Sequence, residues 1–144
     1  MFFGAYEHTI DDKNRLTLPA RFRDALADGV VLTRGLDECL DVFARADWNA
    51  LVEARLAPLD PFSKEARELK RFFFAAAADA EPDKQGRVLV PQALASHAHL
   101  AREVVVAGVH DRLEIWDRMS WAAHVTKVEG SAEDVAERLA DKRV

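Results

Sequence analysis

The segment DDKNRLTLP at residues 11–19 recurs as DKQGRVLVP at residues 83–91, and both copies keep aspartate, arginine and proline at equivalent positions. The offset is 72 residues here and 73 further on, where VVLTRG at 30–35 matches EVVVAG at 103–108. CLDVF at 39–43 likewise matches RLEIW at 112–116, and Trp48 falls on Trp121. Self-similarity over a whole series of elements indicates an internal duplication.

Each copy predicts a turn followed by a short strand with its arginine facing outward. An extended stretch, 5–10 or 77–82, leads into an Asp-x-x-x-Arg turn. Beyond the turn, apolar residues alternate with the arginine, which is typical of a strand with one buried side; they are Leu16 and Leu18, then Val88 and Val90. Arg15 and Arg87 are therefore expected to project from hairpin ends.

A short helix and a hairpin are expected next in each copy. Pro19 and Pro91 suit the first turn of a helix, where no backbone N–H is needed, and Gly29 suits its end. Phe22 and Leu26 share one face of the first helix because they lie four residues apart. Apolar strands joined by Gly- and Asp-rich loops then predict hairpins at 30–33 with 39–43 and at 104–107 with 112–116.

Helical spacing appears between the copies and near the end of the chain. Two apolar stripes predict two linker helices, formed by Trp48, Leu51, Val52 and Leu56 and by Phe62, Ala66, Leu69 and Phe73. Asp60 and Pro61 predict the start of the second helix, with aspartate as its cap. Ser131 to Asp134, after Gly130, fits a capping box and predicts a short amphipathic tail helix.

These patterns predict an α+β, β-rich fold made of two small modules. We expect the modules at residues 5–47 and 77–120, a helical linker at 48–76 and a helical tail at 121–144. A module of about 45 residues buries too little of its surface to be stable alone. The two copies are therefore expected to pack on each other about a pseudo-two-fold axis, as a dimer within one chain.

Composition narrows the class of protein. The chain has 144 residues, 49% of them hydrophobic, which suffices for one ordinary core or two small cooperating ones. It has no apolar run of about 18 residues and no signal-peptide pattern, so we expect a cytoplasmic protein without a membrane partner. Phosphate-binding glycine loops and nucleophile elbows are missing, so the sequence predicts no enzyme and no small-molecule substrate.

No cofactor or metal site is predicted. Cys39 is the single cysteine, so it has no internal disulfide partner and no cysteine with which to share zinc. His97 and His99 are two residues apart, a spacing that would place them on different sides of a helix. Neither histidine has a cysteine or acidic ligand at zinc spacing.

The repeated turns are the predicted binding site for double-stranded DNA. The net charge is −5, yet residues 13–23 contain four cations and no acid, and local cations are what neutralise phosphates. Arg15 and Arg87 are expected to contact bases or phosphates, helped by Lys13, Lys84, Arg21 and Arg23. Asp11 and Asp83 are expected to hold the turn backbone or the arginine four residues on.

A single Asp-x-x-x-Arg motif has a simpler explanation. Taken alone, it is more often a surface salt bridge that closes a hairpin, and such pairs are common and weak. The duplication and the flanking cations favour the DNA-binding interpretation.

The chain resembles the MraZ family over nearly its whole length. The resemblance is carried by Gly4 and Tyr6, by Asp-x-Lys-x-Arg-Leu-x-Leu-Pro-Ala-x-Phe-Arg at 11–23, by Asp-Lys-Gln-Gly-Arg at 83–87 and by Glu-Ile-Trp at 114–116. It implies AbrB-like swapped-hairpin modules, chains assembled into a ring, and a nucleoid-associated, sequence-specific transcriptional regulator. It further implies binding to direct repeats in the promoter of the protein's own cell-division and cell-wall operon.

One departure and one alternative accompany this resemblance. Asn14 stands where the second copy has Gly86, and asparagine is the next best residue after glycine for a left-handed turn, so the loop shape should be kept. The alternative function is an AbrB-like antitoxin or protein-interaction module that binds a toxin as well as DNA. Such proteins usually have one module and a long partner-binding tail, whereas this chain has two modules and a short tail.

Overall fold

The computed structural model describes residues 1–142, so residues 143 and 144 of the expected tail lie outside the described residues. The strands are β1 Phe2–Thr9, β2 Arg15–Thr17, β3 Val30–Arg34, β4 Leu40–Ala44, β5 Ala78–Ala80, β6 Arg87–Leu89, β7 Glu103–His110 and β8 Leu113–Asp117. The helices are η1 Ala20–Phe22 (3₁₀), α1 Arg23–Leu26, α2 Arg45–Leu51, η2 Val52–Leu56 (π), α3 Lys64–Phe74, α4 Gln92–His97 and α5 Arg118–Asp141.

The strands form one large antiparallel sheet and a two-stranded ribbon. The large sheet has the order β1-β7-β8-β4-β3-β5, and the ribbon pairs β2 with β6. Equivalent strands of the two copies therefore occupy mirrored places in this order, and the first strand of each copy pairs with the other copy: β1 with β7, β5 with β3. This topology confirms the predicted α+β fold of duplicated, strand-swapped modules.

A pseudo-two-fold axis crosses both layers. In the ribbon, Leu16 lies opposite Val88, which is its own equivalent in the second copy. In the large sheet, Asp41 lies opposite its equivalent, Glu114. Equivalent residues face each other only on a symmetry axis, so the axis passes through the ribbon and the centre of the sheet. The module boundaries themselves remain a prediction.

The main core lies between the ribbon and one face of the large sheet. Both copies supply it in similar measure, which explains why neither module needs a core of its own. Its fully buried members include Leu16, Leu18, Leu26, Leu32, Leu40, Val88, Val90, Leu94, Leu113 and Ile115. A smaller cluster around Val31, Phe43 and Trp48 packs on the opposite face.

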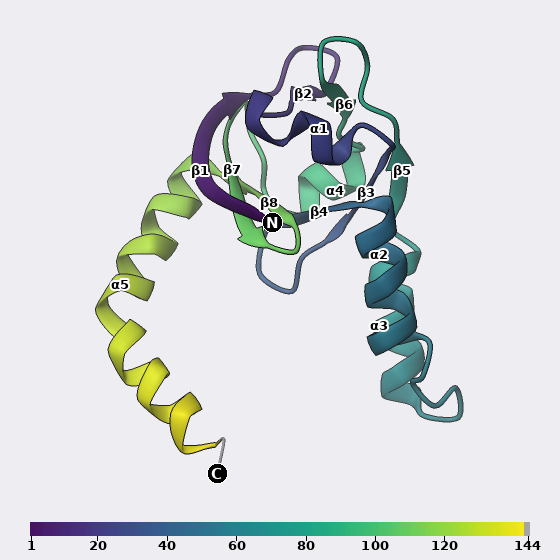
Figure 1. Cartoon of the computed structure of the whole chain (residues 1–144), viewed down its shortest axis with the longest axis vertical. Helices are drawn as coiled ribbons and strands as arrows, with labels where there is room; N and C mark the ends of the chain where they lie inside the picture. Colours follow the sequence, from purple (N-terminus) through teal and green to yellow (C-terminus); the bar gives the residue numbers. More distant parts are fainter. Residues whose placement is uncertain (143–144) are drawn as a thin grey trace.

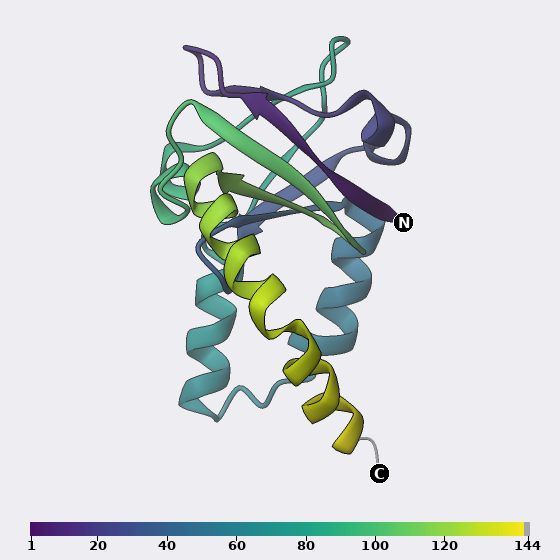
Figure 2. The ribbon, with the colours of Figure 1, turned by 90° about the vertical axis from the view of Figure 1, so that its left-hand side faces the viewer.

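Loops and long helices lie at opposite ends of the molecule. The loops before β2 and β6 rise at one end, whereas α2, α3 and α5 extend from the other (Figures 1 and 2). Figure 2 also shows the two loops separated from each other along their common end. Within residues 1–142, no helix has both the length and the apolar character needed to cross a membrane.

The predicted start of the tail helix was wrong. Helix α5 begins at Arg118 and runs through Gly130 to Asp141, and the Asp117 carboxylate caps it by accepting a hydrogen bond from the Ser120 amide at 3.2 Å. The Ser131 hydroxyl bonds the Lys127 carbonyl and caps nothing. A single helical glycine costs only about 1 kcal/mol, too little to stop a helix that has a good cap and no proline.

The start of the second linker helix was also wrong. Helix α3 begins at Lys64, after Ser63, whose hydroxyl accepts a hydrogen bond from the Ala66 amide at 3.3 Å. Asp60 instead accepts from the Phe62 amide within a turn, and the Phe62 side chain is 91% exposed. Aspartate and serine are both good caps, and the helix uses the one that lies closer to it.

Smaller boundary errors have simple causes. Strand β1 begins at Phe2, three residues before the predicted extended segment, because it pairs with the whole of β7. Pro19 and Pro91 occupy the N-cap positions of η1 and α4 rather than their first turns. The Gly29 stop is confirmed, since its amide bonds the Leu26 carbonyl and its φ is 122°.

Replacing Gly108 with alanine is expected to lower the free energy of unfolding by about 1–3 kcal/mol, the usual range for overpacking. A Cβ there would lie 2.7 Å from the Phe2 carbonyl carbon and 2.8 Å from the Phe3 Cα, backbone atoms of β1 that cannot yield. Gly130→Ala is the control, because nothing lies within 4 Å of its Cβ position. Urea unfolding measures both; an equally stable Gly108→Ala variant would contradict the β1–β7 register.

Candidate nucleic-acid interface

The first Asp-x-x-x-Arg turn is closed by one carboxylate. Oδ1 of Asp11 accepts hydrogen bonds from the Lys13 and Arg15 amides, both at 2.9 Å, and Oδ2 accepts from the Arg15 Nε at 2.8 Å. The main chain adds two more contacts, from the Asp11 amide to the Arg15 carbonyl and from the Asn14 amide to the Asp11 carbonyl. Asp11 therefore fixes both the turn and the direction of the arginine.

The second turn repeats this geometry. Asp83 accepts from the Gln85 and Arg87 amides at 2.9 Å and from the Arg87 Nε at 2.7 Å. These contacts are the ones expected of the two aspartates, and their supporting role at a DNA-binding site stays a prediction. Their hydrogen bonds, first from the arginine amide and also from its guanidinium, hold the pKa values of Asp11 and Asp83 below their ordinary value.

Each loop is anchored by the other copy. The Asn14 carbonyl accepts from the Val90 amide and the Gly86 carbonyl accepts from the Leu18 amide, both at 2.8 Å. Asn14 and Gly86 both have left-handed backbones, with φ of 61° and 76°, so asparagine does preserve the loop shape. The two loops are thus one rigid unit about the pseudo-axis, which we call the loop face: residues 11–17 and 83–89.

The two arginines lie on the side of the ribbon that faces away from the core, because β2 and β6 bury only their central residues. Arg15 and Arg87 side chains are 32% and 30% exposed. Only the Nε of each is bonded to aspartate; among residues 1–142, the terminal nitrogens of both have no hydrogen-bond partner. Arginine prefers paired acceptors such as phosphate oxygens or a guanine edge, so these oriented nitrogens are suited to bind either one.

The structure does not bring all six predicted cations together. Lys13 and Lys84 are exposed in the two loops, beside Arg15 and Arg87. Arg23 lies beneath the second loop, where its Nε donates to the Leu18 carbonyl at 3.0 Å and its side chain packs against Gly86.

Arg21 lies further off, against β1. Its guanidinium stacks on the Phe3 ring at 3.9 Å and donates to the Tyr6 hydroxyl at 3.1 Å. Arg23 therefore packs against the loop face, whereas the contacts of Arg21 are with β1.

Two other side chains on the loop face belong to the same alternating pattern but were not predicted as site residues. Thr17 and Leu89 also face outward from the ribbon, because β2 and β6 bury only their central residues. The register places Arg15 opposite Leu89 and Thr17 opposite Arg87. The alternation that identified the arginines already contained this information.

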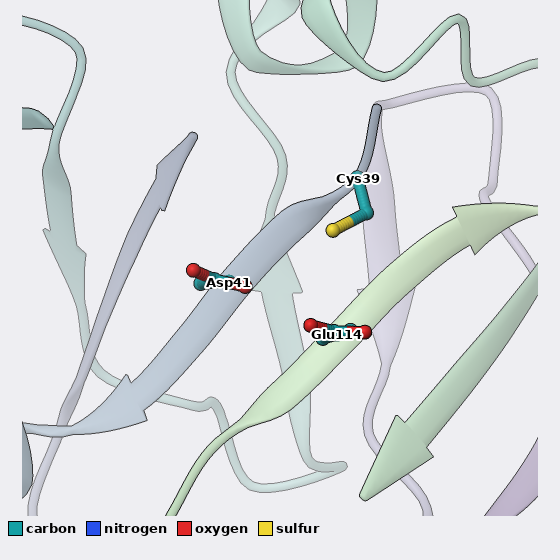
Figure 3. A group of neighbouring side chains, drawn as sticks. All are labelled: Cys39, Asp41 and Glu114. Atoms are coloured by element: carbon teal, nitrogen blue, oxygen red, sulfur yellow. The ribbon is translucent and has the colours of Figure 1, made fainter. Parts of the chain in front are cut away.

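A buried charged cluster lies on the other face of the sheet, at the pseudo-axis. Asp41 and Glu114 are each 9% exposed, and the Cys39 thiol lies beside them (Figure 3). Ligand atoms of these three residues lie within 4.8 Å of one another, a grouping that the sequence did not predict. Arg112 supplies positive charge there, donating to Asp41 at 3.2 Å and to Glu114 at 3.1 Å.

Burial dominates the electrostatics of this cluster. It raises the pKa of Asp41 to about 7, with Arg112 acting in the opposite direction. Burial and the neighbouring Glu114 and Asp41 carboxylates also raise the pKa of the Cys39 thiol, so this thiol stays protonated and unreactive. The cluster therefore acts as a structural ion-pair network.

Comparison with known proteins gives a consistent result. A family model described as "MraZ protein, putative antitoxin-like" matches residues 1–72 and again residues 73–143, one match for each copy. Proteins named transcriptional regulator MraZ from Roseiflexus castenholzii and Ligilactobacillus salivarius are 46% and 45% identical, over 99% and 98% of both chains. One from Heliobacterium modesticaldum is 47% identical over 98% of both chains. The chain therefore belongs to the MraZ family.

Proposed function

We propose that this protein is a sequence-specific DNA-binding transcriptional regulator without enzymatic activity, which binds duplex DNA through the loop face. The observation that supports this most strongly is the pair of partly exposed arginines whose Nε atoms are held by aspartate, while their terminal nitrogens have no hydrogen-bond partner within residues 1–142. The names of the relatives agree with this role. The site comprises Arg15, Arg87, Lys13 and Lys84, with Arg21 and Arg23 adding charge and Asp11 and Asp83 orienting the arginines.

The shape of the ribbon fits the proposal. The major groove of B-form DNA is about 12 Å wide and admits a two-stranded β-ribbon. The ribbon of β2 and β6 carries an arginine on each strand, and both arginines face the same side. The lysines of the flanking loops would meet phosphates, which position the protein, while the ribbon meets base edges.

We further propose that the chains assemble into a ring and bind direct repeats in the promoter of the protein's own cell-division and cell-wall operon, at the nucleoid. Each chain offers one loop face, whose contact with a single repeat is small. A ring presents several such faces at fixed spacing, so repeated sites are bound by avidity.

A gel shift with DNA from upstream of the protein's own gene, at increasing salt, tests the proposal. If the four loop-face cations Arg15, Arg87, Lys13 and Lys84 together displace the counterions of about four phosphates, affinity should fall roughly a hundredfold between 50 and 200 mM salt. Binding that does not change with salt, or equal binding to an unrelated duplex of the same length, would contradict it.

A second candidate is an antitoxin that binds both DNA and a protein toxin, which the description of the matching family model favours. This role would be supported if one small protein copurifies with the full-length chain in a fixed ratio. The two proteins should separate only in high denaturant. Purification of the chain alone would count against it.

A further inference from the structure

The outward side of the ribbon carries four side chains, and they are not symmetric. Arg15 and Arg87 are equivalent, but Thr17 corresponds to Leu89 in the second copy. The register places Leu89 beside Arg15 and Thr17 beside Arg87, and directly opposed side chains in an antiparallel pair lie about 5 Å apart. One arginine therefore has an apolar neighbour and the other a polar neighbour.

Leu89 is open to solvent in spite of its size. Its exposed fraction is 56%, whereas Val88 and Val90 on either side are 2% and 1% exposed. A single exposed leucine means little on an ordinary surface. This one lies directly opposite Arg15 and two residues from Arg87 on the outer side of the ribbon, so a ligand that spans both arginines must also meet the leucine.

The two loops also differ from each other in their charged side chains. Asp12 in the first loop corresponds to Lys84 in the second, and Lys13 corresponds to Gln85. Asp12 is paired with Arg102 at 3.6 Å, a contact that the second loop lacks among the described residues. The pseudo-symmetric backbone thus presents two chemically different halves.

Leucine restricts what can lie opposite it. It has no hydrogen-bonding group, so a phosphate or a polar base edge placed against it would be desolvated without a partner. In the major groove, thymine alone among the four ordinary bases presents an apolar group, its C5 methyl, and apolar side chains recognise it by contact.

We propose that Leu89 contacts the C5 methyl of a thymine next to the base or phosphate bound by Arg15, and that Leu89 is a specificity-determining residue. The inference rests on the proposed DNA-binding function of the loop face. It makes the two halves of the ribbon read different bases, so each chain recognises a site with a direction rather than a palindrome.

Thymine-to-deoxyuridine scanning tests this. A duplex is selected from random-sequence DNA with the full-length protein, and each thymine is replaced in turn by deoxyuridine, which lacks only the methyl. Wild-type protein should bind about fourfold more weakly when one particular thymine is replaced, the factor for about 0.8 kcal/mol of apolar contact. Leu89→Ser should bind the thymine and deoxyuridine duplexes equally.

Two further variants test whether the effect belongs to Leu89 itself. Leu36→Ser removes another exposed leucine, 78% exposed and distant from the ribbon in sequence, and should keep the fourfold effect. Exchanging the two side chains, with Thr17→Leu and Leu89→Thr in one protein, should move the thymine dependence to the other end of the site. Thermal unfolding confirms that each variant is folded.

The proposal is overturned if no thymine replacement weakens wild-type binding, or if the fourfold effect persists in Leu89→Ser. Both results leave the DNA-binding function intact, because the selected duplex is still bound. If selection enriches no duplex at all, the proposed function fails, and this inference fails with it.

Discussion

Arg15→Glu and Arg87→Glu, made separately, should each weaken binding to the promoter duplex by roughly 100-fold or more. A bidentate arginine contact is worth about 1–3 kcal/mol, and a carboxylate in its place adds repulsion from phosphate. Both arginines are held by an aspartate, and their terminal nitrogens have no partner within the part of the chain that the structure describes. Binding is measured by titration of a labelled duplex at constant salt.

Two controls separate lost contact from lost structure. Arg15→Gln and Arg87→Gln keep a side-chain donor near the aspartate and remove the charge, so they should weaken binding with little effect on unfolding. Lys64→Glu reverses a charge on α3, far from the loops (Figure 1), where the side chain is 80% exposed; it should bind normally. If both glutamate variants are folded and bind like wild type, the loop face is not the DNA site.

Arg112→Met should lower the free energy of unfolding by about 3–5 kcal/mol near pH 8. Removing one partner of a buried ion pair leaves uncompensated charge, which is strongly destabilising. Here it leaves the carboxylates of Asp41 and Glu114 next to each other, each 9% exposed. Arg102→Met is the control: its partner Asp12 lies at 3.6 Å and is almost fully exposed, so about 0.5 kcal/mol or less is expected.

The loss should depend on pH with a defined sign. The folded-state pKa of Asp41, about 7, lies above the unfolded value of 3.8, so the folded protein binds more protons between these values. The contribution of Asp41 to the free energy of unfolding therefore falls as pH rises from about 4 to 7. Without Arg112 that pKa rises further, so the deficit should be largest at pH 8 and shrink towards pH 5. If Arg112→Met lowers the free energy of unfolding equally at pH 5 and pH 8, this account is contradicted.

The repeat made the architecture predictable from sequence, because two copies of one pattern leave few ways to cover their apolar faces. The first residues of the helices were harder to predict. Asp60 and Ser63 are both good caps, and Ser131 fits a capping box, yet only Ser63 is used. Several residues near each helix can cap it, and the local sequence does not rank one of them above the others.

The candidate site was predictable in its charges but not in its details. The alternation around Arg15 and Arg87 placed them on the outer face, and the structure agrees. The cross-copy register that sets Leu89 beside Arg15 depends on how β2 pairs with β6, which no spacing in the sequence gives. For the same reason, the meeting of Asp41, Glu114 and Arg112 across the axis was not foreseen.

Lysine footprinting of the full-length protein tests the central claim most directly. The protein is treated with an amine-modifying reagent with and without the promoter duplex, and modified lysines are located by mass spectrometry. Lys13 and Lys84, exposed in the two loops, should be protected by DNA, while the exposed Lys64 and Lys127 on α3 and α5 should react as before. Protection of Lys64 and Lys127 with unchanged reaction at Lys13 and Lys84 would show that DNA binds elsewhere.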